Sequence, residues 1–213
     1  GGIALTLLIG VTGIAFSLPI GIMLALGRTS KLPVLKMLSV IFIEFIRGVP
    51  LIALLFIAST MLNYFLPPGT TFDLLVRVLI MVTFFASAYM AEVIRGGLAG
   101  IPKGQIEAAQ ASGLTYWKTT YLIVMPQVLK ISIPGIVNTF IGLFKDTTLV
   151  LIIGMFDVLG MGRSSLADPN WNGLAREIYI FVAIFFFICC YGMSYYSAYL
   201  ERKLDTENKF QKK

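Results

Sequence analysis

Long apolar stretches alternate with short polar segments along the whole chain. The apolar stretches cover residues 1–27, 37–66, 74–94, 121–156 and 178–200. About 20 residues of α-helix cross the hydrocarbon core of a bilayer, so each stretch is long enough to span a membrane. The two longest, 37–66 and 121–156, contain prolines, and we expect them to be tilted, kinked at proline or extended beyond the membrane. The pattern predicts an all-α integral membrane protein with about five transmembrane helices.

The basic residues between these stretches predict how the helices are oriented. Twelve of the 17 Lys and Arg residues lie on one side: Arg28, Lys31, Lys36, Arg95, Lys103, Lys118, Lys130, Arg202, Lys203, Lys209, Lys212 and Lys213. The opposite side carries Arg77, Arg163 and Arg176. Cytoplasmic loops are enriched in Lys and Arg, so we place the C-terminus in the cytoplasm and the N-terminus outside. We expect residues 1–204 to form a single transmembrane domain, followed by a charged cytoplasmic tail at 205–213.

Composition narrows the function further. The 213 residues are 57% hydrophobic and 13% charged, with a mean hydropathy of +0.86, which excludes an ordinary soluble enzyme or a disordered chain. Histidine is absent, which excludes Ser-His-Asp triads and His-ligated metal sites. The net charge of +6 is explained by residues flanking the spans, so we expect no nucleic-acid partner. No signal peptide is recognisable, and the missing initiator methionine is consistent with a trimmed or partial chain.

The polar segment after the third stretch carries the most information. Pro102 suits the start of a helix and Gly113 suits its end, so about ten residues between them should form a short helix at the cytoplasmic face. Such a helix is too short and too polar to span a membrane. Its alanines leave a smooth surface that another protein could approach, although a simple connecting helix explains the composition equally well.

The spacing within and after this segment points to a known family. Glu107-Ala108-Ala109 is followed after three residues by Gly113, and after nine more by Ile123-Val124-Met125-Pro126. This resembles the EAA motif of ABC-transporter permeases, E-A-A-x3-G-x9-I-x-L-P, with methionine in place of the leucine. Residues 44–50, 87–97 and 145–149 resemble the polar amino-acid importer branch. Residues 41–56 and 174–204 are most similar to the M-type permease subunit of general L-amino-acid importers.

The resemblance implies a non-catalytic permease subunit with a type I importer, MetI-like fold in the bacterial inner membrane. The implied partners are ATPase subunits that hold ATP and Mg, a second permease subunit, a periplasmic amino-acid-binding protein and membrane lipid. No cofactor or metal is implied in this chain, which also lacks a phosphate-binding loop of its own. In the family the EAA helix docks in a groove of the ATPase. The implied coupling residues are Glu107, Ala108, Ala109, Gly113, Ile123 and Pro126.

Charged residues within the apolar stretches are candidate functional groups, because charges inside a membrane are costly and need partners. Glu44 and Arg47, and likewise Glu92 and Arg95, lie three residues apart in two Glu-x-Ile-Arg-Gly sequences. Residues at this spacing share one helix face, so we expect two ion pairs in the cytoplasmic half of the membrane. They could contribute to an inner gate or anchor helices structurally, and both interpretations remain open.

A polar stripe in the fourth stretch suggests a hydrated substrate path for amino acids moved by alternating access. The candidate pathway residues are Leu55, Ser59, Phe85, Asn138, Thr139, Lys145 and Asp146. Packing between helices through small polar residues is the structural alternative. The functional alternative is an ion-coupled secondary amino-acid transporter that uses Lys145 and Asp146, although no long inverted repeat supports it. A purely structural membrane subunit is the third possibility.

Overall fold

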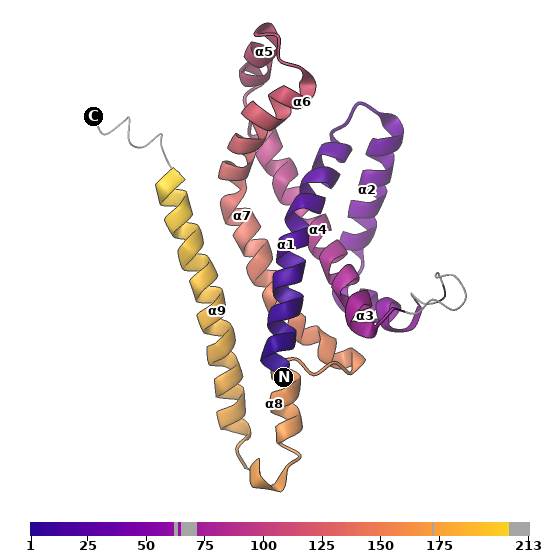
Figure 1. Cartoon of the computed structure of the whole chain (residues 1–213), viewed down its shortest axis with the longest axis vertical. Helices are drawn as coiled ribbons and strands as arrows, with labels where there is room; N and C mark the ends of the chain where they lie inside the picture. Colours follow the sequence, from indigo (N-terminus) through magenta and orange to yellow (C-terminus); the bar gives the residue numbers. More distant parts are fainter. Residues whose placement is uncertain (62–63, 65–71, 172, 205–213) are drawn as a thin grey trace.

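The computed structural model describes residues 1–61, 64, 72–171 and 173–204, and no strand occurs among them (Figure 1). The α-helices are α1 (Gly2–Arg28), α2 (Pro33–Gly48), α3 (Leu51–Phe56), α4 (Leu74–Ala99), α5 (Lys103–Ala111), α6 (Tyr116–Thr119), α7 (Met125–Asp146), α8 (Val158–Ser165) and α9 (Ala175–Leu204). Two segments, η1 (Ile57–Met61) and η3 (Thr120–Val124), are π-helical. Two others, η4 (Thr147–Ile153) and η5 (Pro169–Trp171), are 3-10 helices. The predicted tail at 205–213 lies outside the described residues.

Four segments of the described chain are long and apolar enough to cross a membrane. They are Gly2–Arg28, Leu74–Ala99, Tyr116–Ile153 and Ala175–Leu204. A fifth span exists only if α2 and the following Leu51–Met61 segment are counted together, and these two are bent by 103°. The prediction of about five spans therefore agrees with the structure when this broken segment counts as one. The predicted stretch 121–156 starts too late, because the helical segment already begins at Tyr116.

The break in the second span has a local cause. Val49 adopts an extended conformation, with φ −108° and ψ 132°, between α2 and Pro50. A residue before proline is disfavoured in the helical region, and proline itself cannot donate the next helical hydrogen bond. The expected kink at proline is therefore present.

The centre of the bundle is α4, which packs against α1, α2, α3 and α7. Glycines on α1 allow a close approach, since a Cβ at Gly21 would lie 2.7 Å from the Cβ of Met90 on α4. Small residues serve this purpose between membrane helices, where apolar burial gives little driving force. In contrast, α9 packs at the side of the bundle against α7 and α8.

The two ends of the molecule differ. Helices α5 and α6 lie at one end, which we call the α5 end, and α8 lies at the other, which we call the α8 end (Figure 1). The N-terminus of α1 lies near the start of α8, where the Thr6 hydroxyl accepts a hydrogen bond from the Val158 N–H at 3.1 Å. The short helix α8 lies in the segment between the fourth and fifth apolar stretches.

A buried carboxyl caps α8. The Oδ1 of Asp157 accepts a hydrogen bond from the Gly160 N–H at 2.8 Å, whereas its Oδ2 has no partner among the described residues. The residue is completely buried. Burial raises the pKa of the Asp157 carboxyl above its ordinary value, and backbone amide donors offset part of this rise. The folded state therefore binds the proton more tightly than the unfolded state does.

Replacing Asp157 with asparagine is expected to increase the thermal stability of the protein near neutral pH. A raised pKa in the folded state means that stability is lost as the pH rises from about 3.8 through the folded pKa. Asparagine caps helices about as well as aspartate and does not titrate. The difference in Tm between Asp157→Asn and the parent should therefore shrink as the pH is lowered towards 4. A Tm difference that is constant across this range would contradict the assignment.

Candidate functional site

The segment that carries the EAA-like motif folds as the short helix predicted for it. Helix α5 runs from Lys103 to Ala111, directly after an extended Pro102. Gly113 follows the C-terminal cap of this helix, and its φ of +78° lies in the left-handed region that favours glycine. The Gly113 N–H donates to the Gln110 carbonyl at 2.9 Å, and the Leu114 N–H donates to the Ala109 carbonyl at 3.1 Å. These two bonds form a Schellman motif and end the helix at a defined residue.

The candidate coupling residues are divided between the surface and the core. Glu107, Ala108 and Gly113 are exposed, and a Cβ at Gly113 would have no atom within 4 Å. Ala109 is buried and faces the rest of the protein. Ile123 is half-buried in η3, and Pro126 is exposed in the first turn of α7. The motif therefore presents a smooth surface made of small residues and one carboxylate.

Charged side chains from three helices form a network near the α5 end. Glu92 on α4 is its centre: its Oε1 lies 2.8 Å from Nη1 of Arg28, and its Oε2 lies 2.9 Å from Nη2 of Arg95. Arg47 on α2 is 3.7 Å from the same Oε2. Nη1 of Arg28 also donates to Oε1 of Glu44 at 2.8 Å. The network joins the end of α1 to α2 and α4.

The structure corrects one of the two expected ion pairs. Glu92 and Arg95 contact each other as their spacing predicts. Glu44 and Arg47 do not form an ion pair within the described part of the chain, because each reaches a partner on another helix. Arg28 is a network residue that the sequence reasoning placed in a loop and missed. Local spacing gave no signal for it, because its partners Glu44 and Glu92 are distant from it in the sequence.

A second set of candidate residues lines a cavity of about 300 Å3 between α4 and α7. Its walls include the predicted pathway residues Phe85, Asn138, Thr139 and Asp146. Tyr89, which follows Phe85 by one helical turn and packs on its ring, also lines the cavity and was not predicted. The cavity therefore combines one carboxylate and one amide with two aromatic rings.

The other predicted pathway residues lie elsewhere. Leu55 is completely buried in the core between α3 and α4. The Ser59 hydroxyl donates to the Phe56 carbonyl at 3.0 Å within the bent segment. Lys145 is exposed, and no ion pair between it and Asp146 is formed in the described structure. These three residues are not part of the cavity lining.

Sequence comparisons identify relatives over nearly the whole chain. Residues 17–206 match the family described as "Binding-protein-dependent transport system inner membrane component". The chain is 61% identical over 210 residues to the glutamate/glutamine/aspartate/asparagine transport system permease protein BztC of Rhodobacter capsulatus, covering 98% of this chain and 48% of that protein. It is 54% identical over 206 residues to the inner membrane amino-acid ABC transporter permease protein YhdY of Escherichia coli, covering 97% and 56%. The chain thus spans about half the length of these relatives.

Solved structures agree with the sequence matches. A crystal structure of an amino acid ABC transporter with histidines superposes with a TM-score of 0.81 at 27% identity, over 95% of this chain and 92% of that one. The MetNI methionine ABC transporter, in an inward-facing conformation, shares the fold with a TM-score of 0.68 at 20% identity, over 92% and 91%. The predicted MetI-like fold and the resemblance to polar amino-acid permeases are confirmed. The chain therefore belongs to the family of binding-protein-dependent transport system inner membrane components, the non-catalytic membrane subunits of ABC transporters.

Proposed function

We propose that this chain forms the membrane pathway of an ATP-driven importer that moves polar L-amino acids into the bacterial cytoplasm. The observation that carries the proposal is the exposed helix α5, which presents Glu107, Ala108 and Gly113 at one end of a family member's helical bundle. ATPase subunits that bind ATP and Mg would dock on this helix. A periplasmic amino-acid-binding protein would deliver substrate at the α8 end, and a second permease subunit would complete the pathway.

This arrangement places the α5 end in the cytoplasm. The excess of Lys and Arg beside α5 supports that orientation, because such residues are retained on the cytoplasmic side. The N-terminus of this chain would then lie outside. The C-terminal end of α9, with Arg202 and Lys203 in its last turn, would face the cytoplasm.

The chain connectivity explains how docking at α5 could reach the cavity. Helix α5 is joined to the end of α4 by the short Gly100–Pro102 link, in which Ile101 is buried. After Gly113 the chain passes through α6 and η3 into α7. Helices α4 and α7 line the cavity, so displacement of α5 by a partner is transmitted to both walls as movement of packed helices. Alternating access would follow from this movement.

The cavity residues support an amino acid as the substrate. The Asp146 carboxylate can accept hydrogen bonds from an α-ammonium group, and the Asn138 amide can donate to an α-carboxylate. The Thr139 hydroxyl already donates to the Gly135 carbonyl at 2.8 Å, which leaves its oxygen as an acceptor. The relatives' names specify acidic amino acids, their amides and amino acids in general, so we propose substrates of this class.

Replacing Asp146 with asparagine is expected to raise the substrate concentration for half-maximal uptake about tenfold, because a charge-assisted hydrogen bond contributes about 1.5 kcal/mol or more. The measurement is the initial rate of radiolabelled amino-acid uptake by proteoliposomes that contain the whole transporter. Lys145→Gln is the matched control, since Lys145 neighbours Asp146 but is exposed outside the cavity. Equal concentration dependence in Asp146→Asn and the parent would remove Asp146 from the pathway.

The proposal is tested directly by recovering the tagged chain from its native membrane in mild detergent and identifying copurified proteins by mass spectrometry. We expect an ATPase subunit, and uptake by the reconstituted complex that requires ATP and the binding protein. Recovery of the chain alone, with uptake driven by a proton or sodium gradient, would instead favour the ion-coupled alternative. That alternative has little support here, because the family match and the separate positions of Lys145 and Asp146 argue against it.

A further inference from the structure

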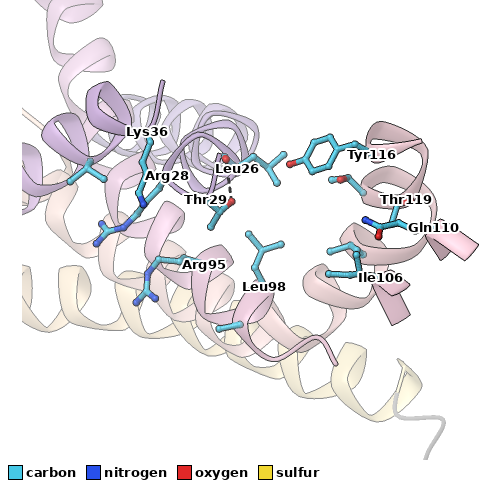
Figure 2. A pocket seen from close by; sticks show the side chains of 14 residues that line it. Leu26, Arg28, Thr29, Lys36, Arg95, Leu98, Ile106, Gln110, Tyr116 and Thr119 are labelled. Atoms are coloured by element: carbon cyan, nitrogen blue, oxygen red, sulfur yellow. Dashed lines mark hydrogen bonds between the residues drawn. The ribbon is translucent and has the colours of Figure 1, made fainter. Parts of the chain in front are cut away.

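A second cavity, of about 610 Å3, opens at the α5 end and has no role in the function proposed above (Figure 2). It lies between the last turns of α1 and α4, the first turns of α2, and the α5–α6 segment. Figure 2 shows Arg28, Lys36 and Arg95 gathered on one side, and Ile106, Gln110 and Tyr116 on the other. Lys36, Gln110 and Tyr116 are exposed, so the cavity is open to the surface.

The charged side of the cavity has an excess of positive charge. Three arginines and two glutamates form the ion network described above, which leaves one net positive charge. Lys36 adds a second, because its side chain has no hydrogen-bond or ion-pair partner among the residues described. No Asp or Glu occurs among the described residues that line the cavity. An anionic group bound here would balance this charge.

An unsatisfied hydroxyl on the opposite side also indicates a ligand. Thr119 is 3% exposed, lines the cavity, and its Oγ1 has no hydrogen-bond partner within the described structure. A buried hydroxyl without a partner is unfavourable, so buried polar groups are normally paired. Leu26 and Leu98 lie between the hydroxyl and the cations, together with Thr29, whose hydroxyl already donates to the Leu26 carbonyl at 3.1 Å. Val124 adds a further apolar side chain to the lining.

We propose that this cavity binds an anionic phospholipid, with its phosphate held by Lys36 beside Arg28 and Arg95 and its acyl region against the apolar wall. Both features are needed for this assignment, since a free phosphate would leave the apolar wall uncovered. The site lies where transmembrane helices α1 and α4 end, which is the depth of lipid headgroups. Basic pockets between membrane helices on the cytoplasmic side suit acidic headgroups. The Thr119 hydroxyl can then bond to a glycerol or ester oxygen.

The bound lipid would contact α5 directly. Ile106 and Gln110 of α5 line the cavity together with residues of α1 and α2, so a lipid would fill the space between the docking helix and the rest of the bundle. If α5 couples ATP hydrolysis to transport, as proposed above, anionic lipid should increase coupled transport. This last consequence rests on the proposed function, whereas the binding site does not.

Binding is tested with the full chain, in its complex, exchanged into phosphatidylcholine nanodiscs with graded amounts of phosphatidylglycerol. Native mass spectrometry after mild ejection measures the retained lipid. The double variant Lys36→Gln with Thr119→Val should retain about tenfold less phosphatidylglycerol, since a basic residue near a membrane surface contributes about fivefold and a hydroxyl somewhat less. Lys31→Gln is the control, because Lys31 lies in the α1–α2 connection just before the helix that carries Lys36, but does not line the cavity. It should retain lipid like the parent.

Two outcomes would overturn the proposal. One is equal retention of phosphatidylglycerol by the parent and the double variant. The other is displacement of the lipid by millimolar inorganic phosphate or glycerol 3-phosphate, which would show a site for a soluble anion. Uptake is measured separately in the same nanodisc-derived samples after reconstitution. Loss of lipid in the double variant would support the lipid site even if no ATP-dependent uptake were found, in which case only the proposed transport function would fail.

Discussion

Replacing Gly113 with aspartate is expected to reduce ATP-dependent uptake about a hundredfold while the protein still inserts and folds, because an unpaired charge buried in a protein interface costs about 3 kcal/mol. Two properties of the residue give this result. Its φ of +78° is unfavourable for a residue with a side chain, at a cost of about 1 kcal/mol. Its Cα faces open space, so aspartate would clash with nothing inside the chain but would project into the surface where we propose that the ATPase docks. The main effect should therefore be on coupling.

The test compares Gly113→Asp with Gly113→Asn in the reconstituted transporter. Asparagine has a similar size, carries no charge and tolerates the left-handed conformation better than most residues. We expect Gly113→Asn to retain measurable uptake and Gly113→Asp to lose both uptake and stimulation of the partner ATPase by binding protein. Amounts in the membrane and Tm should be similar for the two variants. Normal ATP-dependent uptake by Gly113→Asp would exclude α5 as the coupling element.

The α5 segment could be predicted from sequence because its determinants are local. Pro102 and Gly113 define its ends, and the hydrogen bonds that stop the helix link residues no more than five positions apart. The same holds for the break in the second span, where Pro50 acts on the residue before it. The spans themselves follow from hydropathy, since length and apolar composition suffice to identify a membrane helix.

Contacts between helices could not be predicted in the same way. Helix spacing revealed the Glu92–Arg95 pair, but it suggested a Glu44–Arg47 pair that the structure replaces with contacts to Arg28 and Glu92. Arg28 and Glu44 are 16 residues apart and meet only because α1 and α2 pack together. The cavity between α4 and α7 was predictable only in part. The residues that α7 contributes share one helix face, so their spacing indicated them. Tyr89 could not be predicted, because its position in the lining depends on how α4 packs against α7.

Replacing Glu92 with glutamine is expected to give the largest loss of stability among the network variants. Its carboxylate lies between Arg28, Arg47 and Arg95, and its side chain is only 17% exposed. Removing this carboxylate leaves Arg47 and Arg95 without an ion-pair partner among the described residues, whereas Arg28 keeps Glu44. Breaking a largely buried charge group in this way costs about 3 kcal/mol. In a protein of this length such a loss lowers the Tm by roughly 6–12 °C. Glutamine keeps the shape of the side chain, so the effect reports on charge.

Glu44→Gln is the matched control, because Glu44 contacts Arg28 at the same 2.8 Å but its side chain is 54% exposed. Exposed ion pairs contribute about 1 kcal/mol or less, so the Tm of Glu44→Gln should remain within a few degrees of the parent. The measurement is thermal unfolding of each variant in the same detergent. If both variants unfolded at the parent's temperature, the network would not hold α1, α2 and α4 together. An unchanged Tm combined with altered uptake would then favour a gating role for these charges over an anchoring one.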